Sequence, residues 1–222
     1  MKRGLFVSFE GPEGSGKSTI IKMVYEKLAQ LFPQHKTILT REPGGNNNVI
    51  AEQIRQIILQ KTIQQIAPKT EVLLFAASRA QHVHDLILPN LEQGNIVLCD
   101  RFIHSSIAYQ GYARGIDVDK IWEISMFATN NVQPDLSFFL MIPPKEGLKR
   151  INANMLREIN RIDSEDISIH EKVYDGYKNI LKQKKSSYIQ IDANQPVDIV
   201  FKNVMLHLEK AIKKHYGRDK AS

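Results

Sequence analysis

The chain has 222 residues, a length that suits one α/β domain with a sizeable buried core. Its composition, 42% hydrophobic and 24% charged, is that of a globular protein and excludes a disordered or collagen-like chain. The net charge of +6 favours partners such as phosphates, nucleotides or nucleic acid, although much of the excess lies in lysine-rich runs at 182–185 and 210–220 that are typical of solvated surface.

The single cysteine and the lack of a long apolar run bear on location. Cys99 cannot form an intramolecular disulfide, and it lies in the apolar run 96–99, where a small buried thiol is expected. No apolar stretch approaches the ~18 residues that span a bilayer. The first residues reach Glu10 too soon to leave room for a signal-peptide core. We therefore expect a cytoplasmic protein that does not enter a membrane.

Strands and helices are expected to alternate along the chain, which forms a single domain over 1–222. Short apolar runs predict buried parallel strands at 5–9, 37–39, 96–99, 136–141 and 188–191. Apolar residues at helical spacing predict intervening helices at about 20–31, 50–58, 71–88, 118–128 and 196–215. This order predicts an α/β fold, an about five-stranded parallel sheet with helices on both faces and a ligand site at the carboxyl ends of its strands.

Residues 143–185 differ in character from the rest. Pro143 and Pro144 lead into a polar, charge-dense segment, which predicts a mobile insert.

A glycine-rich stretch follows the first predicted strand and precedes a helix, which is the context that a phosphate-binding loop requires. Gly11, Gly14 and Gly16 allow backbone angles that a side chain forbids, so successive N–H groups can surround an anion at the helix N-terminus. Lys17 adds a positive charge for the outer phosphates, and Ser18 offers a hydroxyl to Mg²⁺. The stretch predicts a site for a nucleotide polyphosphate, the alternative being a turn that binds nothing.

The strand predicted at 96–99 is followed by an acid and a base, Asp100 and Arg101. In phosphate-loop enzymes an acid at the end of such a strand lies beside the loop and holds the magnesium shell. We therefore predict a metal site at Ser18 and Asp100, although charged pairs at strand ends also occur without this role.

Other motifs must identify the second substrate, because kinases, switch GTPases and motor ATPases all share the phosphate loop. The Asn-Lys-x-Asp signature of guanine-binding loops does not occur in the chain. Three motifs occur in a fixed order: Thr40-Arg41-Glu42-Pro43-Gly44-Gly45, Leu74-Phe75-Ala76-Ala77-Ser78-Arg79, and Asp100-Arg101-Phe102 followed by Ser105-Ser106 and Ala108-Tyr109-Gln110-Gly111. With the glycine loop, this set resembles thymidylate kinase, a P-loop nucleoside monophosphate kinase, over about residues 4–192.

The resemblance implies a P-loop NTPase fold and transfer of the γ-phosphate of ATP to dTMP, giving dTDP and ADP with Mg²⁺, a step of dTTP biosynthesis. It also implies a cytoplasmic homodimer. From the lack of a long apolar stretch and from the solvated character of the lysine-rich runs, we expect neither a membrane nor nucleic acid as partner. ATP would bind to the loop, Gly11, Pro12, Glu13, Gly14, Ser15, Gly16, Lys17, Ser18 and Thr19. The implied catalytic residues are Lys17, Arg101 and Arg161.

The same resemblance implies the acceptor site. Arg41 and Arg101 would grip the acceptor phosphate, because a guanidinium can donate two parallel hydrogen bonds. Phe75 would stack on the pyrimidine and Arg79 would hydrogen-bond its edge. Base and sugar would be lined by Ser105, Ser106, Tyr109 and Gln110, with Tyr109 crowding a ribose 2′-hydroxyl and Glu13 facing the acceptor sugar.

The polar segment at about 145–170 would be a lid that closes over ATP and excludes water. The phosphate loop contains no arginine, so the chain resembles the lid-arginine bacterial type, with Arg161 supplying charge to the transferred phosphoryl group. It departs from the family at Asn152, Asn154 and Asn160, where lid arginines or an acid are usual, and at Met141, where the strand often ends in Asp. Arg150 or Arg157 are candidate substitutes.

Two other functions remain open at this point. One is another nucleoside or nucleotide kinase of the same fold. The other is a non-catalytic nucleotide-binding protein that uses its basic surface on nucleic acid, which salt-dependent DNA binding without phosphoryl transfer would reveal.

Overall fold

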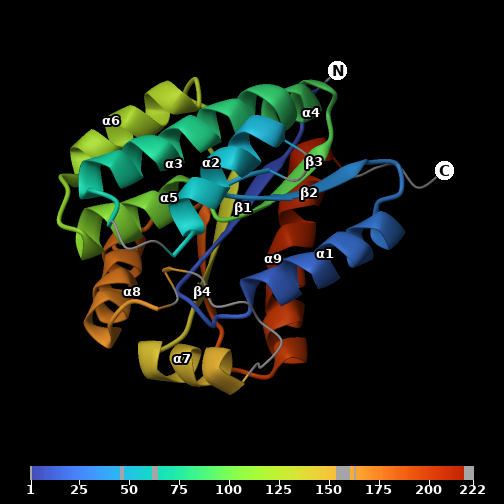
Figure 1. The fold of residues 1–222 in the computed structure, drawn as a ribbon. Helices are drawn as coiled ribbons and strands as arrows, with labels where there is room; N and C mark the ends of the chain where they lie inside the picture. The colour runs from blue at the N-terminus through green and yellow to red at the C-terminus, as the bar shows by residue number, and fades with distance from the viewer. Residues whose placement is uncertain (1, 46–47, 62–64, 154–160, 163, 218–222) are drawn as a thin grey trace.

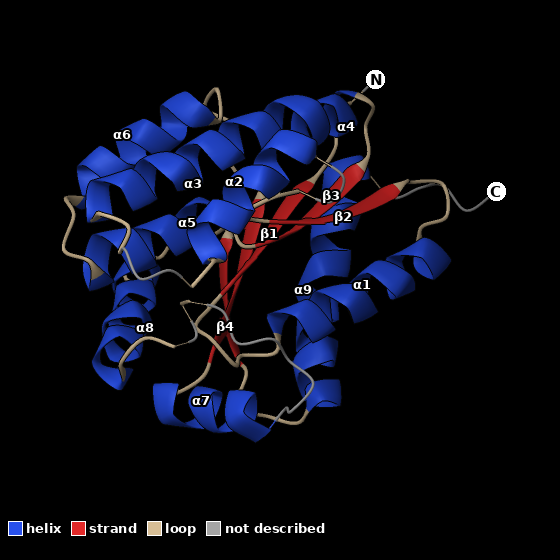
Figure 2. Ribbon diagram, in the orientation of Figure 1, coloured by secondary structure: helices blue, strands red, loops and turns tan. Residues whose placement is uncertain are grey.

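The computed structural model describes residues 2–45, 48–61, 65–153, 161–162 and 164–217. A five-stranded parallel sheet in the order β2-β3-β1-β4-β5 lies between helices on both faces (Figures 1 and 2). The strands are β1 (Phe6–Glu10), β2 (Thr37–Arg41), β3 (Ile96–Asp100), β4 (Leu136–Met141) and β5 (Tyr188–Asp192). The predicted α/β class and all five strands are confirmed.

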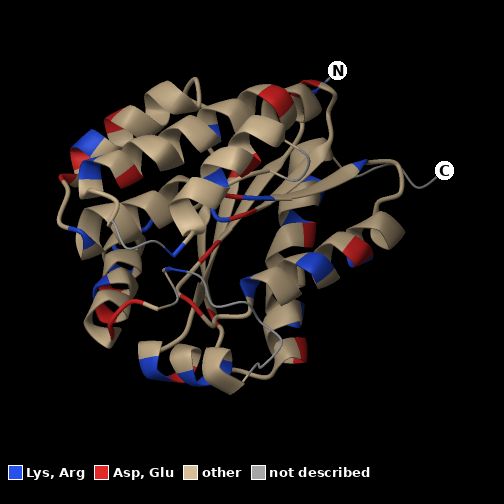
Figure 3. Ribbon diagram, in the orientation of Figure 1, with Lys and Arg blue, Asp and Glu red and all other residues tan. Residues whose placement is uncertain are grey.

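Four of the strands continue one or two residues past their predicted ends. The added residues are polar: Glu10, Thr40, Arg41, Asp100 and Asp192. The apolar sequence pattern therefore ends before the backbone hydrogen bonding between the strands does. Because parallel strands end at one edge, acids and bases collect there, and Figure 3 shows them intermixed where β1, β2 and β3 end.

The helices cover the two faces of the sheet unequally (Figure 1). Helices α1 (Lys17–Leu31) and α9 (Val197–Tyr216) enclose one core with residues such as Phe9 and Phe138. The opposite core contains Phe6 and Phe139. Phe138 and Phe139 thus face opposite cores, which explains why the strands read as continuous apolar runs. The remaining elements are α2 (Val49–Leu59), α3 (Pro68–His82), α4 (Leu88–Glu92), α5 (Ile103–Ser106), α6 (Val118–Ala128), α7 (Pro144–Ala153), α8 (Ile167–Leu181) and the π-helical segments η1 (Val83–Ile87) and η2 (Ile107–Ala113).

The helix predicted at 71–88 is longer than expected. It begins at Pro68 and passes through α3, η1 and α4 to Glu92. Pro89 has no N–H to donate to the preceding turn, and the backbone widens into η1 just before it, where the Leu88 N–H donates to Val83 O. The π-helical turn lets the chain carry a proline without ending the helix.

The mobile insert predicted at 143–185 is wrong over its second half. Helix α8 packs against η2 and buries Val173, Tyr177 and Ile180, whose spacing of four and three residues places them on one helical face. Gly176 allows the close approach, since a Cβ there would contact the Ala108 backbone. Of the predicted lid, 154–160 and 163 lie outside the described residues, including Asn154, Arg157 and Asn160.

No helix in the described ranges has an apolar stretch of the length that a bilayer crossing requires.

Candidate active site

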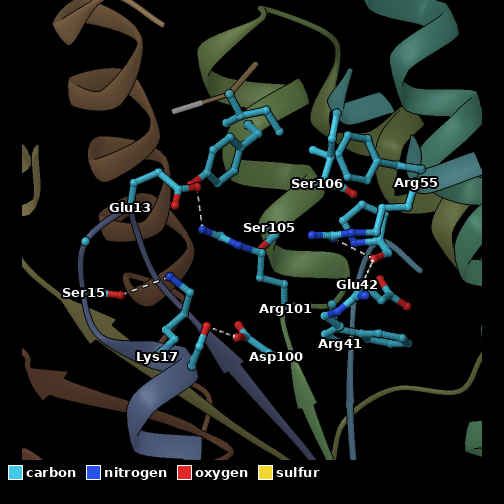
Figure 4. Close-up of a pocket in the computed structure, with 18 of the residues that line it drawn as sticks. Glu13, Ser15, Lys17, Arg41, Glu42, Arg55, Asp100, Arg101, Ser105 and Ser106 are labelled. Atoms are coloured by element: carbon cyan, nitrogen blue, oxygen red, sulfur yellow. Dashed lines mark hydrogen bonds and ion pairs between the residues drawn. The ribbon is translucent and has the colours of Figure 1, made fainter. Parts of the chain in front are cut away.

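A cavity of about 520 Å³ opens at the carboxyl edge of the sheet. Figure 4 shows Lys17 and Asp100 on one side of it, Arg41, Glu42 and Arg55 on the other, and Arg101 between them. The predicted residues that line it are Glu13, Gly14, Ser15, Gly16, Lys17, Ser18, Thr19, Arg41, Phe75, Arg79, Asp100, Arg101, Ser105, Ser106, Tyr109 and Gln110. The structure therefore brings the phosphate loop and the predicted acceptor residues to one place.

The loop between β1 and α1 has the conformation that its glycines allow. Gly14 and Gly16 have φ of 72° and 79°, in the left-handed region that favours glycine, and Gly16 is the N-cap of α1. The Lys17 Nζ donates to Gly11 O and Pro12 O, both at 2.9 Å. Burial, followed by the nearby Arg101 charge, lowers the pKa of Lys17 to about 8. The ammonium thus lies inside a glycine-rich loop at a helix N-terminus, a position that suits an anion.

Ser18 and Asp100 lie together at the start of α1 and the end of β3. The Ser18 hydroxyl donates to Asp100 Oδ2 at 2.6 Å. A hydroxyl and a carboxylate are hard oxygen donors, so this pair fits Mg²⁺ shared with nucleotide phosphates. The described residues contain no group of three or more His, Cys, Asp or Glu side chains that could hold a metal ion by itself.

Arg101 is held by four hydrogen bonds in a strained backbone position. Its φ is 70°, which is uncommon for a residue with a side chain. Its guanidinium donates to Gly11 O at 3.0 Å, to Ser105 Oγ and Tyr177 Oη at 3.2 Å, and to Glu13 Oε1 at 2.7 Å. Although burial acts to lower the pKa of Arg101, the Glu13 carboxylate raises it, so the guanidinium stays charged. Rigid donors at this point suit a phosphate between two substrates.

Glu10 is a residue that sequence reasoning missed. It ends β1 and is fully buried, accepting hydrogen bonds from the Phe102 N–H at 2.9 Å and the Ser105 hydroxyl at 2.6 Å. These bonds fix the turn after β3 on which Arg101 lies. The sequence feature that could have indicated Glu10 is a charged residue directly after an apolar run.

Arg55 was missed as well. Together with Ala51 and Ile58 it occupies the inner face of α2, at spacings of four and three. Arg55 and Arg41 both donate to Pro43 O, at 2.9 and 3.0 Å, and burial followed by the Arg41 charge lowers the pKa of Arg55. A base on the otherwise apolar face of a helix was the signal for it.

Arg79 is held by a buried carboxylate. Its Nε donates to Glu42 Oε2 at 2.7 Å, and its Nη2 donates to Ser106 Oγ at 3.0 Å. The other Glu42 oxygen lies 3.3 Å from His82 Nδ1, and His82 Nε2 lies 2.8 Å from Thr40 Oγ1. Glu42 and His82, neither predicted, thus fix the arginine, while Phe75 lines the cavity one helical turn before it.

Arg161 is not among the residues that line the cavity. Its Nε donates to Ile58 O at 2.9 Å and its Nη2 donates to Glu71 Oε2 at 2.5 Å, so it lies against α2 and α3. Arg150 on α7 does line the cavity, and its Nη1 donates to Ala193 O at 2.9 Å. Of the two lid candidates in the described residues, the structure places Arg150 at the cavity.

Comparison with known proteins identifies the family. The profile of the thymidylate kinase family matches residues 9–204. The chain is 48% identical over 204 residues to a thymidylate kinase of Clostridium novyi, covering 92% of this chain and 98% of that protein. It is 46% identical over 214 residues to one from Lactobacillus acidophilus, covering 96% and 97%. The crystal structure of thymidylate kinase from Ehrlichia chaffeensis superposes with a TM-score of 0.75 at 30% identity, covering 93% of this chain and 99% of that one.

The matches cover nearly the whole chain, and the phosphate loop and arginines meet in one cavity. The chain belongs to the thymidylate kinase family, nucleoside monophosphate kinases that use ATP to phosphorylate dTMP to dTDP.

Proposed function

We propose that the cavity holds ATP and dTMP end to end and transfers the γ-phosphoryl group between them, as a step towards dTTP. The observation that carries this proposal is the shared cavity: Lys17 and Arg101 line the same space as Phe75 and Arg79. A phosphate loop alone would serve any nucleotide. A pocket with an aromatic face and fixed donors beyond it accounts for the second substrate.

The donor side is formed by the loop, Gly11 to Thr19. The Lys17 ammonium donates to the loop carbonyls and, at 3.0 Å, to Ser15 Oγ. We infer that the polyphosphate of ATP takes over this ammonium, with backbone N–H groups on its other oxygens. Ser18 and Asp100 would hold Mg²⁺, which neutralises developing charge on the phosphates when bound.

The acceptor side would be formed by Arg41 and Arg101 for the phosphate and by Phe75, Arg79, Ser105, Ser106 and Gln110 for the pyrimidine. Tyr109 supports a role at the sugar: its hydroxyl donates to Glu13 Oε1 at 2.8 Å, and the Arg101 guanidinium lies 5.0 Å from its ring centroid. Glu13 thus joins Tyr109 to Arg101, and this bridge accounts for an acid within an anion-binding loop. A fixed ring at this point would exclude a 2′-hydroxyl.

The assignment of a lid arginine to the transferred phosphoryl group stays a proposal. Arg161 is the choice that the family pattern favours, and Arg150 is the one that its position at the cavity favours. Alanine variants of each would separate them. Replacing the arginine that stabilises the transition state should lower kcat about 10³-fold and leave dTMP binding little changed.

We also propose a homodimer formed through the layer of α2, α3 and α6, which lie side by side (Figure 1). Large apolar side chains are exposed on all three: Ile57 by 46%, Leu73 by 58% and Phe127 by 88%. Large exposed apolar side chains on neighbouring helices are typical of a protein interface. The substrates, ATP and dTMP, imply a cytoplasmic location.

A coupled ADP-release assay across dTMP, dUMP, dCMP, dGMP and AMP tests the proposed function. We expect dTMP to be the best acceptor, and Lys17→Ala to abolish turnover with an unchanged thermal unfolding temperature. Preference for another acceptor would instead indicate a different kinase of this fold. DNA binding without any ADP release would indicate a non-catalytic protein.

A further inference from the structure

One end of the Gln110 carboxamide is held by the buried carboxylate of Glu71, which has no role in the proposed function so far. The Gln110 Nε2 donates to Glu71 Oε1 at 2.8 Å, and the two side chains lie on different elements, η2 and α3. Both residues are almost wholly buried, with 1% and 2% exposed. Gln110 lines the cavity, whereas Glu71 lies behind it.

The orientation of this amide follows from chemistry. Both Glu71 oxygens act as acceptors, Oε1 from Gln110 and Oε2 from Arg161, and a side-chain carboxylate has no N–H to donate. Of the two ends of the Gln110 carboxamide, only the NH₂ group can therefore face Glu71. Its carbonyl oxygen must point the other way, and no group in the described ranges donates to that oxygen.

Glu71 is itself held in place by cations. Arg161 Nη2 lies 2.5 Å from Oε2, and Arg114 Nε lies 3.6 Å from Oε1. Glu165 pairs with both arginines: it accepts from Arg114 Nη2 and lies 3.7 Å from Arg161 Nη1. Two guanidiniums compensate the buried charge, so Glu71 is a fixed acceptor rather than a group that can turn away.

We infer that Glu71 is a specificity-determining positioning residue, which locks the Gln110 carboxamide with its oxygen toward the acceptor base. This inference rests on the proposed placement of the base beside Gln110. Thymine and uracil carry an N–H donor at ring position 3, which pairs with a carbonyl oxygen. Cytosine carries a lone pair there, so its ring nitrogen and the Gln110 oxygen would face each other as two acceptors, without a hydrogen bond. The site thereby selects a pyrimidine with a donor at this position.

The test compares kcat/KM for dTMP, dUMP and dCMP in the wild type and in Glu71→Gln. A glutamine at 71 can donate or accept, so the Gln110 amide is free to turn. We expect kcat/KM for dTMP and dUMP to fall together by about tenfold or more, and the dTMP:dCMP preference to shrink by about tenfold or more. The dTMP:dUMP ratio and the KM for ATP should not change, since neither the 5-methyl contact nor the donor side is altered.

Glu165→Gln is the matched control, because it touches the same two arginines but not Gln110; it should keep the wild-type dTMP:dCMP preference. Gln110→Leu serves as a second probe and keeps the test decisive if Glu71→Gln does not fold. It should lose the preference to the same extent, and Glu71→Gln should have no further effect on the preference in that background.

Parallel loss of activity on all three acceptors in Glu71→Gln, or an unchanged dTMP:dCMP preference in Gln110→Leu, would overturn the inference. Failure of the wild type to phosphorylate dTMP would refute the proposed function instead, so the two outcomes are distinguishable.

Discussion

The most direct test of the loop geometry is the pH dependence of ATP capture. The Lys17 ammonium is buried, and burial, followed by the Arg101 charge, lowers its pKa from 10.5 to about 8. A lowered pKa means that the charged form is lost on the alkaline side, above pH 8. At pH 9 about nine-tenths of the free protein would carry a neutral amine at position 17.

A neutral amine cannot pair with the outer phosphates of ATP. We therefore expect kcat/KM for ATP to fall about tenfold per pH unit above 8. In the ATP complex the phosphate charges favour the ammonium, so kcat at saturating ATP should hold to higher pH. Nearby groups do not share this range: burial raises the pKa of Cys99 and Tyr109 well above their ordinary values. The phosphates of ATP and dTMP titrate near pH 6 and are fully ionised.

Stopped-flow or steady-state rates between pH 7 and 9.5 at constant ionic strength measure the profile, with kcat/KM for dTMP at saturating ATP as the internal comparison. Calorimetric titration of ATP at pH 8.5 in buffers of different ionisation enthalpy should register uptake of a proton. A flat kcat/KM for ATP up to pH 9.5, or no proton uptake, would contradict the reasoning about Lys17.

Three further predictions concern the metal pair, the loop packing and the dimer. Asp100→Asn should raise the Mg²⁺ concentration for half-maximal rate by about 10- to 100-fold, measured by Mg²⁺ titration at fixed ATP; an unchanged midpoint would remove Asp100 from the metal site. Gly147→Ala should raise KM for ATP by about tenfold, because its Cβ would overlap the Glu13 carbonyl oxygen and displace the phosphate loop; an unchanged KM for ATP would show that the loop tolerates this contact. Phe127→Asp should convert a dimer to a monomer in light scattering, and an unchanged mass would place the interface elsewhere.

The parts of the site that follow the chain locally were predictable from sequence. The glycine loop, the acid that ends β3 and the arginines next to strand ends all lie where the ends of the strands carry polar residues. In each case a local motif fixes both the residue and the end of the sheet it occupies. The η2 segment carries Tyr109 and Gln110 into the same cavity, as the family resemblance implies.

The residues that hold the site residues in place were not predictable, because each forms its hydrogen bonds with residues far away in the sequence. Glu10 acts on residues 92 and 95 positions away, and Glu42 binds Arg79, 37 positions away. No spacing rule connects such residues before the sheet order is known. Arg161 illustrates the same limit: its family motif suggests a partner at the transferred phosphate, whereas its contacts in this structure are 103 and 90 positions back, with Ile58 and Glu71.

The ion pairs of the cavity differ in a way that suits two different tasks. Arg79 and Glu42 are 2% and 3% exposed at 2.7 Å, so separating them would strand a buried charge, which costs about 3–5 kcal/mol. Arg41 and Glu52 are 37% and 26% exposed at 3.0 Å, and such pairs contribute only about 0–1 kcal/mol. An incoming phosphate can therefore take Arg41 from Glu52 at little cost, whereas Arg79 keeps its carboxylate and offers only its remaining N–H groups. On the proposed placement of dTMP, Arg79 thus forms a rigid part of the base side, whereas Arg41 can adjust to a phosphate whose charge changes during the reaction.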